Sequence, residues 1–157
     1  MKTARSRWTF RRGLRRRSTR RLVSRTRSIH RWPGLAAAAT ITCSHSSPTS
    51  VRFATSAQDI EKISRIPADI VIVTAAADPE QPFDFVSRAF APNLGIDEDP
   101  VTGSAHTVLA PFWGDRLGRA ALVGLQASAR SGLVGVELIG DRVIVSGRAV
   151  TMQDDLL

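Results

Sequence analysis

The chain has 157 residues, of which 43% are hydrophobic, so it has room for one ordinary domain with an apolar core. This composition excludes a wholly disordered chain, and no run of about 18 uninterrupted apolar residues is present to form a transmembrane helix. The single cysteine, Cys43, excludes an internal disulfide and a thiolate metal cluster. With only three widely spaced histidines beside it, a structural zinc site is not expected.

Charge divides the sequence into two parts. The whole chain has 22 Lys and Arg and 14 Asp and Glu, a formal net charge of +8. Residues 1–58 contain 14 of the basic residues and no acidic residue, whereas residues 59–157 contain 8 basic and 14 acidic residues and so carry −6. The basic character therefore belongs to one segment. We expect residues 1–57 to be an Arg-rich leader and residues 58–157 to be the folded domain.

The leader has too few apolar residues, too irregularly placed, to define a buried face, so the sequence predicts disorder there. Four interpretations stay open. They are a mitochondrial transit peptide, a twin-arginine type of export signal, an arm that binds nucleic acid or anionic lipid, and the product of a wrongly placed reading frame. Only Trp8, Phe10 and Trp32 lie among the arginines, which argues against RNA contact.

Two strands are predicted at the start of the folded part. The β-branched run Asp69–Ala75 is typical of a buried strand, and turn-forming residues follow it. A second strand is predicted at Phe83–Ala91, where alternate residues from Phe83 to Ala89 share one face. This strand is expected to end at Pro92.

A helix is predicted over Ala105–Leu117, because apolar residues recur there at spacings of three and four. One side of this helix is expected to be buried, Pro111 to bend it or leave a carbonyl unpaired, and Gly118 to end it. Three later runs predict a β-meander, at Ala121–Ala129, Leu133–Ile139 and Arg142–Val150, with a hairpin between the last two. The order of strands, one apolar helix and more strands predicts an α+β fold, with a sheet or barrel wrapped around one central helix.

The loop before the helix is the strongest candidate site. Three acidic residues, ending at Asp99, precede a glycine-containing turn that leads directly into the helix. The first-turn N–H groups of a helix are unpaired and partly positive, so Gly103 would let an anionic ligand approach them, and Ser104 adds a hydroxyl. We expect the ligand group to be a carboxylate or a phosphate, with a nearby Asp holding a polar group or moving a proton.

A purely structural interpretation of this loop stays open. In this interpretation Thr102 or Ser104 caps the helix, while the acidic residues favour its positive end. His106 alone is more often a packed histidine than a catalyst. Ser104 and His106 do not form a nucleophile–base pair of the G-x-S-x-G type, because that motif is absent.

The run DFVSRAFAPNLGIDEDPVTGSAHTVLAPFWGDRLGR resembles the C-terminal half of the phenazine biosynthesis PhzF-like isomerase family, and EDPVTGSAH is its most specific part. The resemblance extends over residues 58–157. It implies a diaminopimelate-epimerase-like fold, in which two similar lobes each wrap strands around a central helix and the active site lies between them. Asp99, Gly103 and Ser104 match the active-site loop of the second lobe. Epimerases of this fold that use two cysteines have a cysteine near the position of Asp99, so that mechanism is excluded.

What the resemblance implies for function is an isomerase that moves a proton within a small carboxylate-bearing metabolite, without a metal or cofactor. Asp99, Gly103 and Ser104 would bind the substrate, with Asp99 and, on weaker grounds, His106 as catalytic residues. The G-N-P motif and the glutamate of the family's first lobe are not found, and residues 1–58 contain no Glu.

We therefore expect this chain to lack the first lobe and to be inactive alone, with that lobe or a second copy as partner. The alternatives are a truncated remnant or binding lobe and, less favoured, a nucleic-acid binder acting through the Arg arm. No membrane association is expected, and the expected location is the cytoplasm.

Overall fold

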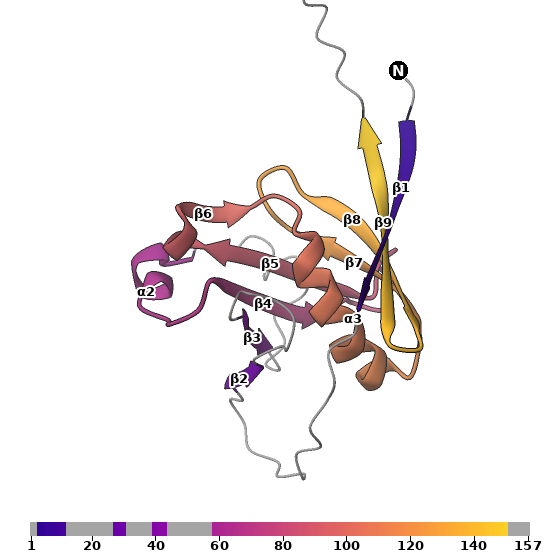
Figure 1. The fold of residues 1–157 in the computed structure, drawn as a ribbon, viewed down its shortest axis with the longest axis horizontal. Coiled ribbons are helices and arrows are strands. Elements are labelled where there is room, and N and C mark those ends of the chain that lie inside the picture. Colours follow the sequence, from indigo (N-terminus) through magenta and orange to yellow (C-terminus); the bar gives the residue numbers. More distant parts are fainter. Residues whose placement is uncertain (1–2, 12–26, 31–38, 44–57, 151–157) are drawn as a thin grey trace, which may run out of the picture.

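The structure, a computed structural model, describes residues 3–11, 27–30, 39–43 and 58–150 (Figure 1). The described strands form one sheet in the order β1-β9-β8-β7-β5-β4-β3-β2, with β6 beside β5. The strands are β1 (Thr3–Arg11), β2 (Arg27–His30), β3 (Ala39–Cys43), β4 (Ile70–Ala76), β5 (Phe85–Ala91), β6 (Ile96–Asp99), β7 (Ala121–Gln126), β8 (Gly132–Ile139) and β9 (Arg142–Val150). The helices are α2 (Ile60–Ser64), the short 3-10 helix η1 (Pro92–Leu94) and α3 (Gly103–Leu117).

The sheet is mixed, and the crossover between β5 and β7 positions α3. Strands β4 and β5 pair antiparallel, as do β7, β8 and β9, whereas β5 and β7 pair parallel. A parallel pair needs a long connection, and here β6 and α3 provide it. The helix consequently lies against one face of the sheet, which curves around it from β4 to β9 (Figure 1). This is the α+β arrangement of a sheet around one central helix that the sequence predicts.

Burial explains why α3 is central. Its residues from Ala105 to Gly114 are all buried, so the helix is enclosed on every side and not only on the one side expected from its apolar spacing. Its ring contacts are with β5, where Phe85 stacks on Trp113 with 5.9 Å between ring centroids. The helix ends at Gly118, which has φ of 66° in the left-handed region, as the sequence predicts.

The opposite face of β4 and β5 carries two smaller apolar clusters. One contains Ala75, Val86 and Ala127, and the other lies under α2 and includes Ile63 and Phe90. Helix α2 begins at its N-cap Asp59, whose carboxylate accepts the N–H of Lys62 at 3.1 Å. No helix among the residues that the structure describes is both long and apolar enough to cross a bilayer.

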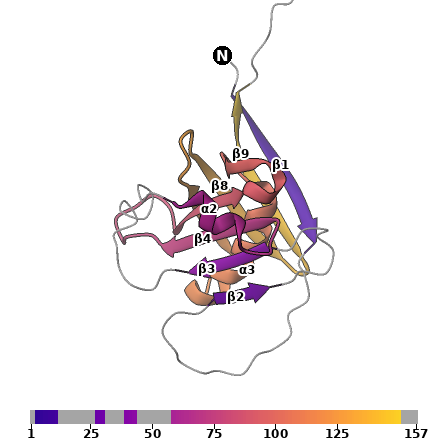
Figure 2. The same ribbon diagram turned by 90° about the vertical axis from the view of Figure 1, so that its left-hand side faces the viewer.

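Three strands lie in the leader, where the sequence predicts disorder. Strand β1 pairs antiparallel with β9, and β3 pairs parallel with β4 (Figure 2). Strand β2 pairs antiparallel with β3, on the side away from β4. The structure differs from the expectation at these three stretches. Backbone pairing along a sheet edge does not need an apolar stripe, so the hydrophobic pattern carries no signal for it. The rest of the leader, including the run Arg12–Arg17, lies outside the described residues.

The other predicted elements are confirmed within a few residues, and three elements are not predicted by the sequence, namely α2, η1 and β6. The strand predicted at Phe83–Ala91 begins at Phe85, and the meander runs are β7, β8 and β9. Strand β6 falls in a stretch predicted to be a loop, and the short helix α2 was not anticipated. The β6 sequence IDED is short and acidic, so it lacks the alternation by which a strand is predicted.

Candidate functional site

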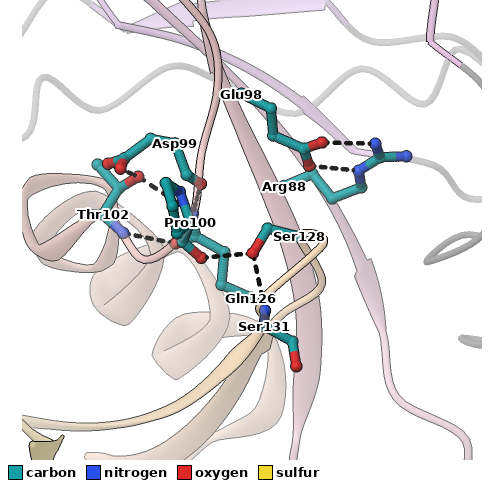
Figure 3. A network of polar contacts seen from close by, with 8 residues as sticks. All are labelled: Arg88, Glu98, Asp99, Pro100, Thr102, Gln126, Ser128 and Ser131. Carbon is teal, nitrogen blue, oxygen red and sulfur yellow. Dashed lines mark hydrogen bonds and ion pairs between the residues drawn. The ribbon is translucent and has the colours of Figure 1, made fainter.

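The candidate site is the connection between β6 and α3, with the end of β7 beneath it (Figure 3). Strand β6 ends at Asp99, and α3 begins at Gly103. Asp99 and Ser104 are half-buried, while Gly103 is exposed. The structure therefore brings the three residues predicted to bind substrate onto one short surface segment, as their closeness in sequence requires.

Thr102 is the centre of the hydrogen-bond network. Its backbone N–H donates to Gln126 Oε1 at 2.8 Å, and its hydroxyl donates to Asp99 Oδ2 at 2.5 Å. Its carbonyl oxygen is 2.8 Å from His106 Nδ1 and also accepts the backbone N–H of His106 at 3.4 Å. Every polar group of Thr102 is thus engaged, which fixes the residue immediately before the helix.

Gln126, the last residue of β7, connects both ends of the loop. Its side chain is 0% exposed, and its Nε2 donates to the Asp99 carbonyl at 2.7 Å and to Thr102 Oγ1 at 3.1 Å. Figure 3 shows the amide lying between these two residues. A buried amide is costly unless its donors and acceptor are paired, and here they all are.

A second set of contacts fixes the middle of the loop. Ser128 donates its hydroxyl proton to the Pro100 carbonyl at 2.8 Å and accepts the N–H of Ser131 at 2.9 Å. A Cβ built at Gly132 would lie 2.7 Å from Val101 Cγ2, so the start of β8 packs closely on the loop. The loop is therefore supported along its whole length by the β7–β8 turn.

An ion pair attaches β6 to the sheet next to Asp99. Arg88 Nε donates to Glu98 Oε1 at 2.7 Å and Nη2 donates to Oε2 at 2.8 Å, a two-bond geometry (Figure 3). The two side chains are only 12% and 21% exposed. The guanidinium carbon also lies 5.1 Å from the Phe90 ring centroid. Both carboxylate oxygens of Glu98 are therefore paired with Arg88.

His106 lies in the core beneath the loop, at 0% exposure. Because the Thr102 carbonyl can only accept, Nδ1 carries the ring proton, and Nε2 is left buried without a partner. Burial lowers the pKa of the His106 imidazole below its usual value of 6.5, and the hydrogen bond to Thr102 opposes this only in part. A neutral, enclosed imidazole supports the loop from below and does not face solvent.

The start of α3 has no side-chain cap. Thr102 has the extended conformation of an N-cap residue, with φ of −101° and ψ of 104°, but its side chain makes no capping hydrogen bond. Its hydroxyl instead donates to Asp99 and accepts from Gln126. A cap by Thr102 is therefore not present. The Ser104 carbonyl accepts the Thr107 hydroxyl at 2.7 Å, inside the first turn.

Gly103 is distinctive among the glycines in the described part of the chain. Gly95, Gly118 and Gly140 have positive φ, and the others have at least one atom within 4 Å of a built Cβ. Among the described glycines, Gly103 alone combines a φ outside the left-handed region with open space around a built Cβ. Neither backbone conformation nor packing against the described residues therefore explains a glycine here.

Gln126 is the site residue that sequence reasoning missed. It lies 24 positions from Thr102, and the only signal for it is a polar residue at a buried position of β7. Within the described residues, no three His, Cys, Asp or Glu side chains gather as metal ligands do.

Residues 38–155 match the family model of the phenazine biosynthesis-like proteins, which is well over half of the chain. The chain belongs to this family. The match begins before residue 58, and so includes β3 as well as the part that carries the predicted resemblance.

Two relatives illustrate the similarity of this phenazine biosynthesis-like chain to known proteins. An uncharacterized isomerase of Pseudomonas aeruginosa is 50% identical over 93 residues, which are 59% of this chain and 35% of that protein. A human phenazine biosynthesis-like domain-containing protein is 43% identical over 91 residues, which are 55% of this chain and 32% of that protein. The chain spans about a third of the length of the curated relatives it matches.

Two solved structures share the fold of this phenazine biosynthesis-like chain. A PhzF family protein of Enterococcus faecalis superposes with a TM-score of 0.61 at 32% identity, over 80% of this chain and 48% of that one. A crystal structure of the PhzC/PhzF type from Clostridium difficile has a TM-score of 0.70 over 98% of this chain and 58% of that one. At 24% identity the second similarity shows the fold alone.

Proposed function

We propose that residues 58–150 form the substrate-binding lobe of an isomerase that moves a proton within a small carboxylate-bearing metabolite. The observation that carries this proposal is Gly103, whose lack of a side chain is explained by neither backbone conformation nor packing. Membership of a family whose relatives include proteins named isomerases supports the reaction class. The proposed chemistry is acid–base catalysis by side chains, without a metal or cofactor.

The proposed roles follow from the geometry. The substrate carboxylate binds at the start of α3, where Gly103 allows close approach and Ser104 adds a donor. Asp99 contacts an amine or hydroxyl of the substrate through the oxygen that Thr102 does not occupy. His106 acts through Thr102, because an imidazole at 0% exposure cannot reach a bound substrate. His106 is therefore a positioning residue in this proposal and not the proton carrier.

Besides Asp99, proton transfer needs an acid–base side chain on the other side of the substrate. Glu98 is paired with Arg88 and does not serve this purpose. We propose that a facing lobe supplies the glutamate that the family resemblance implies, and that residues 58–150 alone bind but do not turn over substrate. Apolar side chains of Ile96, Val101 and Leu133, which are 47%, 38% and 52% exposed, lie on this lobe and would be covered by such a partner.

Binding can be tested on the full 157-residue chain with anthranilate, which carries an amine and a carboxylate. We expect anthranilate to shift the amide resonances of Gly103, Ser104 and Ala105, and aniline, which lacks the carboxylate, to leave them unchanged. Gly103→Ala should fold normally, because its Cβ meets no atom within 4 Å, yet weaken binding about tenfold by occupying the ligand's space. Equal binding by the Gly103→Ala variant would contradict the proposed site.

Catalysis is tested separately, by incubating the same chain in D₂O with a dihydro-hydroxyanthranilate-type substrate and following deuterium incorporation. We expect binding without exchange. Exchange by a monomer of the purified chain would show that it needs no facing lobe. Light scattering then distinguishes a monomer, which fits a separate lobe as partner, from a dimer in which a second copy faces the site.

A further inference from the structure

We propose that Gln126 is a positioning residue that keeps the Thr102 hydroxyl on Asp99 and thereby leaves the start of α3 open for the substrate carboxylate. The effect of Gln126 on substrate binding rests on the proposed function. The hydrogen bonds that carry it stand independently of any ligand (Figure 3).

The orientation of the Gln126 amide is fixed by its partners. The backbone N–H of Thr102 can only donate, so the atom that it contacts at 2.8 Å is the amide oxygen. The carbonyl of Asp99 can only accept, so the atom at 2.7 Å from it is the amide nitrogen. The two contacts agree, and neither survives a flip of the amide.

The same orientation sets the direction of the Thr102 hydroxyl. Because Nε2 of Gln126 has only protons to offer, Thr102 Oγ1 accepts from it at 3.1 Å and must direct its own proton elsewhere. That proton goes to Asp99 Oδ2 at 2.5 Å. The chain of donors therefore runs from Gln126 through Thr102 to Asp99, and ends on the carboxylate proposed to contact the substrate.

The competing arrangement needs no change in the backbone of Thr102. Thr is a favoured N-cap residue, and Thr102 already has the backbone angles of one. Rotation of its χ1 would let the hydroxyl accept a first-turn N–H of α3, the group proposed to bind the carboxylate. In the structure this cap is absent, and the hydroxyl is instead occupied by Gln126 and Asp99. Gln126 thus selects the uncapped arrangement.

The position of Gln126 suits this role because its backbone is fixed on both sides. It ends β7 and pairs with Ser87 of β5 and with Gly132 of β8. An apolar side chain would be cheaper to bury than an amide at 0% exposure. The amide at this position is therefore explained by its hydrogen bonds, which hold the Asp99–Thr102 loop in place.

The test compares Gln126→Leu, Thr102→Val and the double variant in the full chain, with Gln81→Leu as a matched control outside this network. Thr102 χ1 is measured through three-bond couplings, and anthranilate affinity through amide shifts. We expect Gln126→Leu to populate a second Thr102 rotamer and to weaken anthranilate about tenfold. The Gln81→Leu variant should leave both readouts unchanged.

The double variant separates positioning from simple loss of structure. Valine cannot cap the helix, so Gln126→Leu with Thr102→Val should bind anthranilate more tightly than Gln126→Leu alone. If the double variant binds no better, the proposal is overturned. An unchanged Thr102 rotamer in Gln126→Leu also overturns it.

Failure of this inference is distinguishable from failure of the proposed function. If the wild-type chain binds no anthranilate, the proposed function fails, while the Thr102 rotamer still decides the role of Gln126. Should Gln126→Leu not fold, Gln126→Asn serves in its place, because it keeps the amide but is one methylene too short to span Thr102 and Asp99.

Discussion

Trp113 of α3 donates its indole N–H to the hydroxyl of Thr74 on β4, at 2.9 Å, inside the helix–sheet interface. The Thr74 hydroxyl in turn donates to the carbonyl of Val86 on β5 at 2.7 Å. Two side chains that are 4% and 0% exposed thus connect the helix to two neighbouring strands. The bond fixes the rotation of α3 relative to the sheet, and with it the direction in which the start of the helix faces.

Thr74→Val should lower the free energy of unfolding by about 1–3 kcal/mol, because valine keeps the shape of threonine but leaves the Trp113 N–H buried and unpaired. Thr74→Ser keeps the hydroxyl and should restore the part of the loss that is due to the hydrogen bond. Urea unfolding of the three proteins, followed by tryptophan fluorescence, gives the comparison. A Thr74→Val protein as stable as the wild type would show that the bond contributes nothing.

The ion pair between Arg88 and Glu98 should matter far more than an exposed pair of the same types. Glu98→Gln weakens two hydrogen bonds between mostly buried groups, and we expect a loss of about 2 kcal/mol in the free energy of unfolding. The control is Glu61→Gln on α2, where Glu61 and its partner Arg65 are 78% and 70% exposed, and the loss should stay below about 0.5 kcal/mol. Equal losses in the two variants would contradict this ranking.

Gly124 allows β7 to approach the core ring of Phe85. A built Cβ would lie 2.5 Å from Phe85 Cε2, and the ring is itself 0% exposed and stacked on Trp113, so it has no room to move. Gly124→Ala should therefore cost about 1–3 kcal/mol of stability through overpacking. Gly147→Ala is the control, since the nearest atom to its Cβ is the Leu133 carbonyl oxygen at 3.9 Å. Thermal unfolding of both variants decides the point.

The sequence predicted those parts of the site whose residues are neighbours along the chain. Asp99, Gly103 and Ser104 lie within one turn and helix start, so their proximity follows from local structure alone. The central helix could also be predicted, because its apolar residues recur at helical spacing. Gly118 could be assigned as its stop from the preference for glycine at this position.

The supports of the site could not be predicted, because they depend on strand register. Gln126 meets Thr102 only because β7 pairs parallel with β5 after the crossover. Arg88 meets Glu98 only because β6 pairs antiparallel with β5. The register of this pair is irregular between Ala89 and Ala91. Neither contact leaves a periodic pattern in the sequence. The pairing of β1 with β9 depends on residues at opposite ends of the chain.

The buried imidazole of His106 makes the stability of the protein depend on pH. In the native state burial lowers the pKa of the imidazole below 6.5, whereas in the unfolded state it titrates near that value. As pH falls below 6.5 the unfolded chain takes up a proton that the native chain does not, so stability falls, with a slope of at most about 1.4 kcal/mol per pH unit from this group. The loss stops once the pH is below the native pKa.

The measurement is urea unfolding of the wild type and of His106→Gln between about pH 5 and pH 7. Glutamine does not titrate and keeps an N–H donor for the Thr102 carbonyl, so the difference between the two stability curves isolates the imidazole from the carboxylates that titrate at lower pH. We expect the wild type to lose stability relative to His106→Gln as the pH is lowered from 7 to 5. Parallel curves would mean that His106 becomes charged as readily inside the folded protein as in the unfolded chain. Its burial beneath Thr102 would then be incomplete in solution, and its role in fixing the loop would have to be abandoned.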